Sequence, residues 1–197
     1  MVLQRGERQA QRTKAAIIHA LCTLMREKHY QAITIQEIVD RANTGRSTLY
    51  RYFPSKADII TQMHIDIFVR MNFAPATAAE WLADEPPAQL VQLLARFAQS
   101  GASPFYFVAE LGQDTDYVLR SIEDLLAQSF EASLHSAFCE AKSTMPFAVL
   151  ARAIAGIYHW LARYGTSASS HPAPAAMAAY IHRLSRATLL EAVGPGR

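Results

Sequence analysis

Apolar residues in this chain recur at the spacing of helices, and this periodicity constrains the fold more than any other feature. Ile17, Ala20, Leu21 and Leu24 mark one face of a helix over residues 9–28. Similar patterns predict helices over residues 35–42, 46–53, 56–72, 88–100, 115–142, 146–165 and 174–193. Alternating patterns typical of strands are nearly absent. The sequence therefore predicts an all-α protein.

Composition narrows the class of protein. Hydrophobic residues make up 51% of the 197 residues, which excludes a disordered chain. Charged residues are only 18%, against ~25% in ordinary domains, so some apolar surface is expected to be covered by a partner. The two cysteines, Cys22 and Cys139, have no metal-ligand spacing. We expect a cytoplasmic protein, because charged or polar residues interrupt or directly follow the apolar runs over residues 15–25 and 145–165, which therefore fit neither a signal peptide nor a membrane span. No metal or cofactor is expected.

Charge is distributed unevenly along the chain. Residues 1–56 contain ten basic and four acidic side chains, whereas residues 57–197 contain nine and thirteen. A basic N-terminal quarter on an acidic body is typical of a protein that binds a polyanion through its head. A solvated helix surface explains charge alone equally well, so a motif must decide between the two.

Residues 34–53 have the layout of a helix-turn-helix. Thr34 and Glu37 form a capping-box pattern that starts a short helix, and Asn43 suits the left-handed conformation just past its end. Gly45 can then cap a second helix, residues 46–53. In this geometry the second helix lies in the major groove of DNA.

The side chains of this motif suit DNA recognition. Arg46 can contact guanine O6 and N7, Thr48 can contact a thymine methyl group, and Tyr50 can donate to phosphate. A surface ion pair for Arg46 and a half-buried position for Tyr52 are the alternatives. The predicted DNA-binding residues are Thr34, Thr44, Gly45, Arg46, Ser47, Thr48, Tyr50, Tyr52 and Lys56.

The run over residues 34–56, TIQEIVDRANTGRSTLYRYFPSK, resembles the DNA-binding signature of TetR-family regulators. Two positions depart from the usual pattern: Asn43 stands where the family often has Gly, and Gly45 where it often has Ser. The resemblance implies a three-helix DNA-binding domain over residues 1–54, followed by a larger helical domain for effector binding and dimerisation over residues 55–197.

The resemblance also implies that the middle helices enclose an effector. Large aromatic residues with a few polar tips suit a mostly apolar organic ligand, although core packing explains each of them as well. The predicted effector-binding residues are His64, Ile67, Phe68, Met71, Phe105, Phe107, Tyr117, Phe130, Leu134, His135, Phe138 and Tyr158.

The last two helices are implied to pair with their copies in a dimer. The strongly polar residues of the helix over residues 146–165 share one narrow stripe: Arg152, His159 and Arg163. Most of the remaining circumference is apolar, so this helix must be covered on more than one side. The predicted interface residues are Ile154, Ile157, Leu161, Met177, Tyr180, Ile181, Leu184 and Thr188.

These features together predict a homodimeric, ligand-responsive repressor that binds a pseudo-palindromic DNA operator. Two other functions stay open: a DNA-bound adaptor whose C-terminal domain binds another protein, and a thiol redox sensor. An enzyme is not expected, because the sequence lacks the motifs of metalloproteases, serine hydrolases, phosphate loops and dinucleotide-binding folds.

Overall fold

The computed structural model describes residues 5–71, 74–99, 110–167 and 172–194. Within these ranges every regular element is a helix, which confirms the predicted fold class. The chain divides into two compact units: unit 1 contains Met1–Asp66 and Glu110–Val118, and unit 2 contains Ile67–Ala109 and Leu119–Arg197. The predicted boundary after residue 54 remains a prediction. Among the described helices, none has the length and hydropathy needed to cross a membrane.

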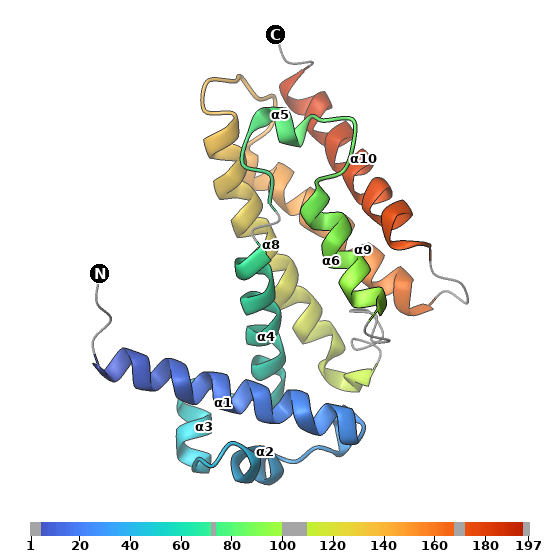
Figure 1. The fold of residues 1–197 in the computed structure, drawn as a ribbon. Coiled ribbons are helices and arrows are strands. Elements are labelled where there is room, and N and C mark those ends of the chain that lie inside the picture. Colours follow the sequence, from blue (N-terminus) through green and yellow to red (C-terminus); the bar gives the residue numbers. More distant parts are fainter. Residues whose placement is uncertain (1–4, 72–73, 100–109, 168–171, 195–197) are drawn as a thin grey trace. The chain divides into compact units, whose positions relative to one another are not determined.

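Unit 1 contains the helix-turn-helix. Its helices are α1 (Arg5–Glu27), α2 (Ile35–Arg41), α3 (Arg46–Tyr52) and the first part of α4 (Lys56–Met71), and a 3-10 helix, η1 (Tyr30–Ala32), connects α1 to α2 (Figure 1). α1 packs against α2, and α2 packs against α3. The apolar face expected for α1 is buried in this unit together with residues of the short helices; its largest fully buried side chains include Ile17, Leu21, Tyr30, Ile38 and Leu49.

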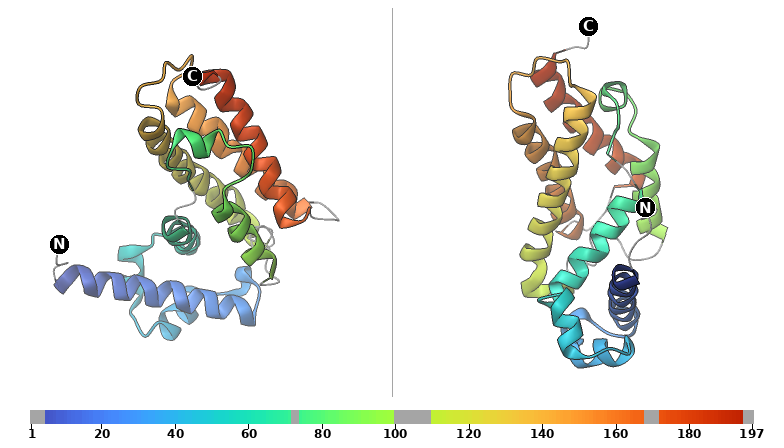
Figure 2. Two further views of the ribbon diagram at one scale, coloured as in Figure 1. Left: turned by 45° about the horizontal axis from the view of Figure 1, so that its top comes forward. Right: turned by 90° about the vertical axis from the view of Figure 1, so that its left-hand side faces the viewer.

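Unit 2 is a bundle of longer helices. It contains α5 (Ala78–Trp81), α6 (Ala88–Gln99), most of α8 (Thr115–Ala137), α9 (Phe147–Ser167) and α10 (Pro174–Val193). α10 packs against both α6 and α9 (Figure 2). α8 ends five residues before the predicted position. The chain instead turns toward α10, where the Thr144 N–H donates to the Ala192 carbonyl at 2.9 Å.

Aromatic rings fill the core of unit 2. The ring centroids of Trp81 and Phe130 lie 5.6 Å apart in an edge-to-face arrangement, and those of Phe130 and Tyr158 lie 5.3 Å apart. The Trp81 indole N–H donates to the Ser133 hydroxyl at 2.9 Å, which satisfies a polar group that would otherwise be costly to bury. The sequence-based helices omitted α5, although its Thr77–Glu80 capping box repeats the pattern at Thr34.

Candidate nucleic-acid interface

Hydrogen bonds define both ends of α2 and the turn that leads to α3. The Glu37 N–H donates to the Thr34 hydroxyl at 3.3 Å, and the Thr34 N–H donates to the Glu37 carboxylate at 2.9 Å. After α2, Asn43 is left-handed with φ 49°. The Thr44 N–H then donates to the Val39 carbonyl at 3.0 Å. These contacts confirm the predicted capping box and the predicted left-handed turn.

α3 presents two different faces. Leu49 is fully buried and Phe53, which ends the helix, is 2% exposed, so this side anchors α3 in unit 1. On the other side Arg46, Ser47 and Tyr50 are exposed. Of the other predicted DNA-binding residues, two are exposed, Thr34 and Gly45, and four are half-buried, Thr44, Thr48, Tyr52 and Lys56. A recognition helix needs this combination of a buried anchor and an open polar face.

Basic side chains gather around Tyr52. The guanidinium of Arg51 lies 4.9 Å from the centroid of the Tyr52 ring and donates to its hydroxyl oxygen at 3.2 Å. The ammonium of Lys14, from α1, lies 5.7 Å from the same centroid. Sequence reasoning missed Lys14 and Arg51 as candidate phosphate contacts; the position of Lys14 depends on the packing of α1 near Tyr52, whereas Arg51 is the neighbour of Tyr52 on α3.

Lys56 and Thr34 already have partners inside the protein. The Lys56 ammonium donates to the carbonyls of Tyr30 and Ile33, both at 2.8 Å, and lies 4.0 Å from the centroid of the Tyr30 ring. Burial lowers the pKa of Lys56. The Thr34 hydroxyl donates to the Glu37 carboxylate at 2.9 Å. Lys56 therefore connects η1 to α4, and one of its three ammonium donors is left over for a phosphate.

Residues 110–118, here called the 110–118 segment, belong to the same unit as the helix-turn-helix. The buried Tyr30 hydroxyl donates to the Asp114 carboxylate at 2.7 Å. The Tyr117 hydroxyl donates to the Asp58 carboxylate at 2.5 Å. Burial and the hydrogen bond to Asp114 raise the pKa of Tyr30, so this phenol stays protonated. The two tyrosine–aspartate pairs bind the segment to η1 and α4.

Two comparisons of sequence find similarity to known proteins over part of this chain. Residues 17–63 match the model for bacterial regulatory proteins of the tetR family. An uncharacterized HTH-type transcriptional regulator, YdeS of Bacillus subtilis (strain 168), is 33% identical over 60 residues. That match covers 30% of this chain and 30% of YdeS. Residues 17–63, which match the family model, include the turn and both helices of the motif described above.

Solved structures match nearly the whole chain. FadR of Thermus thermophilus, a TetR-family transcriptional repressor in complex with lauroyl-CoA, has a TM-score of 0.60 at 18% identity, covering 93% of this chain and 100% of its own. A TetR transcriptional regulator from Rhodococcus sp. RHA1 has a TM-score of 0.58 at 16% identity, covering 95% and 98%. The chain thus resembles tetR-family regulators in the sequence of residues 17–63 and in its overall fold. At these identities the structural likeness establishes the fold alone.

Two predicted effector-binding residues lie in unit 1. His64 is buried, and its Nδ1 lies 2.9 Å from the Ile60 carbonyl. Burial lowers the pKa of His64, which favours the neutral imidazole. Tyr117 is exposed and bonded to Asp58, as described above. His64 is thus enclosed by unit 1, whereas Tyr117 contributes to the attachment of the 110–118 segment.

Other predicted effector-binding residues belong to the packed core of unit 2. Phe130, Leu134 and Phe138 are buried, and Tyr158 packs against the same cluster. His135 lies at the surface instead, with its side chain 64% exposed. Its ring lies edge-to-face with that of Phe147, with 5.0 Å between the centroids. Ile67 is half-buried. Phe105 and Phe107, and the side chains of Phe68 and Met71, lie outside the described residues.

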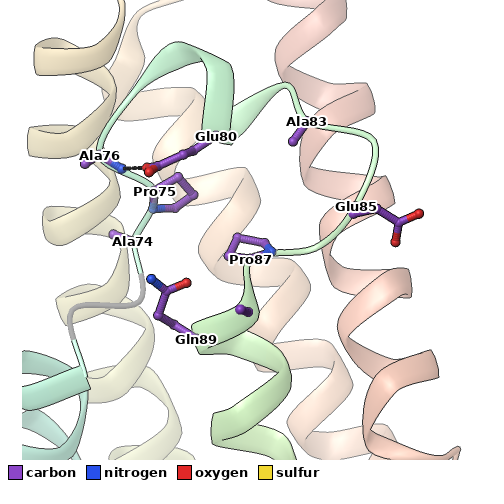
Figure 3. Close-up of a pocket in the computed structure, with 9 residues that line it drawn as sticks. Ala74, Pro75, Ala76, Glu80, Ala83, Glu85, Pro87 and Gln89 are labelled. Atoms are coloured by element: carbon purple, nitrogen blue, oxygen red, sulfur yellow. Dashed lines mark hydrogen bonds between the residues drawn. The ribbon is translucent and has the colours of Figure 1, made fainter.

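A cavity of about 310 Å³ lies in unit 2 beside α5 and the start of α6 (Figure 3). Its lining is formed by Ala74, Pro75, Ala76, Glu80, Ala83, Glu85, Pro87, Ala88 and Gln89. None of these nine residues is aromatic or was predicted to bind an effector. The Glu80 carboxylate accepts the Ala76 N–H at 2.6 Å, so it supports the start of α5. This cavity does not match the aromatic pocket expected from the sequence.

The predicted dimer residues divide between core and surface. Met177 and Ile181 are buried in unit 2 beside Leu90 and Leu94 of α6, and the half-buried Ile157 of α9 packs against them. Ile154 is buried in the other core cluster of this unit, which also contains Phe130 and Leu134. Tyr180 and Leu184, by contrast, are 48% and 49% exposed. Thr188 is half-buried and Leu161 lies outside the described side chains. The dimer interface remains a prediction; Val149 of α9, which is 52% exposed, is a further large apolar side chain at the surface.

Proposed function

We propose that this TetR-family transcriptional regulator is a homodimeric repressor that binds a pseudo-palindromic operator and is released by a mostly apolar small molecule. The observation that carries the proposal is the outer face of α3. Arg46, Ser47 and Tyr50 are exposed there, while Leu49 holds the helix from behind. Two such helices in a twofold dimer would meet half-sites about 34 Å apart or a multiple of it.

Charge supports binding of DNA by this face. Lys14 and Arg51 lie around Tyr52, where their ammonium and guanidinium groups can contact phosphates beside the major groove. Residues 57–197 carry thirteen acidic and nine basic side chains and would be repelled by the duplex, whereas residues 1–56 carry ten basic and four acidic ones. Residues 1–56 are therefore oriented toward DNA by long-range electrostatics as well as by contacts.

Relatives support an apolar effector. FadR of Thermus thermophilus was solved with lauroyl-CoA, and RolR, which has a TM-score of 0.54, was solved with resorcinol. α4 begins in unit 1 and ends in unit 2, so it is a covalent path by which a ligand can change operator binding. To lower the fraction of dimers in the DNA-binding state from ~99% to ~1%, the ligand must bind the other state more tightly than the DNA-binding state by about 5.5 kcal/mol.

Selection of binding sites from a random DNA duplex pool tests the proposal. We expect enrichment of a pseudo-palindrome whose affinity falls steeply with salt and is lost in Arg46→Ala. Gln128→Ala, an exposed change in α8, serves as the control and should bind normally. Enrichment of no sequence by the purified protein would contradict the proposal.

The direction of regulation needs a separate test. DhaS, which has a TM-score of 0.52 to this chain, is an operon activator, whereas FadR is a repressor. A reporter gene placed behind the selected operator should be expressed less when this protein is present. Higher expression would show activation and overturn the repressor assignment while leaving operator binding intact.

An adaptor that binds another protein is the second candidate. The observation that favours it is the close packing of Phe130, which is fully buried against Trp81 and Tyr158. A metabolite that enters unit 2 must raise the thermal midpoint of the protein, because it binds only the folded state. A panel of acyl-CoA esters and phenols should include such a molecule; if none shifts the midpoint, the adaptor becomes the preferred function.

A further inference from the structure

A chain of side-chain hydrogen bonds connects the two helices of the helix-turn-helix. The Arg46 Nε–H, on α3, donates to the Gln36 side-chain oxygen on α2 at 2.7 Å. The Gln36 side-chain NH₂ donates to the Asp40 carboxylate, one turn further along α2, at 2.7 Å. Among the described residues, Arg46 has no other hydrogen-bond partner, so both its terminal amino groups remain available.

The chemistry of the partners fixes the direction of this chain. A carboxylate only accepts hydrogen bonds and a guanidinium only donates them. Gln36 must therefore turn its NH₂ toward Asp40 and its oxygen toward Arg46, and the opposite orientation would lose both bonds. Since Nε is occupied, the guanidinium can meet a ligand only through Nη1 and Nη2, at the end of the side chain.

We propose that Gln36 positions Arg46 for an end-on, bidentate contact with a guanine of the operator, and that Asp40 holds Gln36 in the required orientation. The proposal rests on the proposed function, in which α3 lies in the major groove. Nη1 and Nη2 form a planar fork that matches the O6 and N7 acceptors of guanine. Because Gln36 holds the stem of the fork before DNA arrives, less side-chain entropy is lost on binding.

Space around the start of α3 fits this arrangement. Gly45 precedes Arg46, and a Cβ at position 45 would meet only the Ser47 hydroxyl oxygen, at 3.9 Å. No side-chain oxygen caps this end of the helix. Arg46 is thus the first long side chain of α3, and Gln36 fixes it from the neighbouring helix.

The test uses the full-length protein with the selected operator and its single base-pair variants. Arg46→Ala first identifies the base pair that Arg46 reads, as the position where discrimination is lost. Gln36→Met keeps the length of the side chain but removes the amide. We expect it to reduce discrimination at that base pair by about 3- to 10-fold, the net value of one hydrogen bond. Discrimination at the other positions should not change.

Combinations and controls separate positioning from a structural role. Gln36→Met should add little to Arg46→Ala, because the amide acts only through the arginine. Asp40→Asn retains an acceptor for Gln36 and should keep discrimination, whereas Asp40→Ala should partly lose it. Gln128→Met, an exposed change in α8, should leave both affinity and discrimination unaltered.

Three results would overturn the proposal. A uniform loss of affinity in Gln36→Met at every base pair would show that the contact only supports the fold of the motif. Unchanged discrimination in Gln36→Met would show that the hydrogen bond does not matter in the complex. If Arg46→Ala weakens all duplexes equally, Arg46 contacts phosphate; the positioning role then fails while operator binding, and with it the proposed function, stands.

Discussion

The ammonium of Lys56 donates to the carbonyls of Tyr30 and Ile33, two residues that are themselves buried. Lys56→Met would remove these bonds and leave the Ile33 carbonyl without this donor, whereas the Tyr30 carbonyl would keep its bond from the Ile33 N–H at 3.1 Å. We expect the free energy of unfolding to fall by about 1–3 kcal/mol, which is the usual cost of an unsatisfied buried group. Urea unfolding measures the change, with Lys142→Met, an exposed substitution, as the control.

The same variant distinguishes two roles for Lys56. Sequence reasoning assigned it to a phosphate of DNA, and the structure shows two internal bonds in addition. If Lys56→Met leaves stability unchanged but reduces both operator affinity and its salt dependence, phosphate contact is the dominant role. A loss of stability with normal affinity at low temperature would assign it to the connection between η1 and α4.

The carboxylate of Glu37 gives a second prediction at this scale. The hydrogen bond from Lys28, together with those from Thr34, lowers the pKa of Glu37 from its ordinary 4.5 to about 2. A carboxyl group whose pKa is lower in the folded state stabilises the fold above pH 4.5. That contribution is lost as the pH falls from 4.5 toward 2.

Lys28→Met should therefore raise the pKa of Glu37 toward 4.5. Carbon-detected NMR titration of the Glu37 carboxyl group measures the shift directly. The bonds from Thr34 remain in the variant, so the pKa should stay somewhat below its ordinary value. A Glu37 pKa that does not respond to Lys28→Met would show that the capping box alone accounts for the low value.

At the scale of elements, the attachment of the 110–118 segment depends on one glycine. Gly112 has φ +59°, and a Cβ at this position would lie 2.2 Å from the Gln31 side-chain nitrogen. Gly112→Ala should therefore destabilise unit 1 through two effects, the left-handed backbone and the clash. The backbone effect alone costs about 1–2 kcal/mol.

Gln31→Ala separates these two effects. In the double variant the clash is gone, so thermal unfolding should recover part of the loss while the cost of the left-handed backbone remains. Gly6→Ala, where a Cβ has nothing within 4 Å, is the matched control. Complete recovery in the double variant would contradict a contribution from backbone strain at Gly112.

The capping boxes, the turn and most helices could be predicted from the sequence, because their signals lie within a few residues. Asn43 and Gly45 are examples: each was assigned from its position next to a helix end. The bond between Tyr30 and Asp114 spans 84 residues and has no local pattern, so it could not be predicted. The partnership of Gln36 with Arg46 was missed for the same reason, since it depends on how α2 packs against α3.

Helical spacing also fails to identify which side of a helix faces its own chain. Met177 and Ile181 are buried beside Leu90 and Leu94 of α6, whereas Leu184 of the same helix is exposed. All three are apolar residues at helical spacing, and the sequence analysis assigned them all to the dimer. Only the position of α6 shows that α10 has one face in the core and one that is exposed.

At the scale of the whole molecule, the chain passes between the two units three times. It crosses within α4 after Asp66, before Glu110, and within α8 after Val118. An effector that changes unit 2 can therefore influence unit 1 through α8 and the 110–118 segment as well as through α4. A mechanism that considers α4 alone would omit two of these three connections.

The exposed face of α10 provides the last prediction, which concerns assembly. Leu184 and Ile181 are three residues apart, but Leu184 is 49% exposed and Ile181 only 2%. If Leu184 lies in the dimer interface, Leu184→Asp should yield a folded monomer by sedimentation velocity, with normal far-UV circular dichroism. Ile181→Asp should instead unfold unit 2, because it buries a charge without a partner.

Operator binding links this monomer to function. A dimer binds its second half-site at a high effective concentration, which increases affinity by about 10²–10⁴ over one head alone. Leu184→Asp should lose most of this factor on the full palindrome while binding an isolated half-site as the parent protein does. If the variant remains dimeric, another exposed surface forms the interface, and Val149→Asp on α9 is the next substitution to separate the protomers.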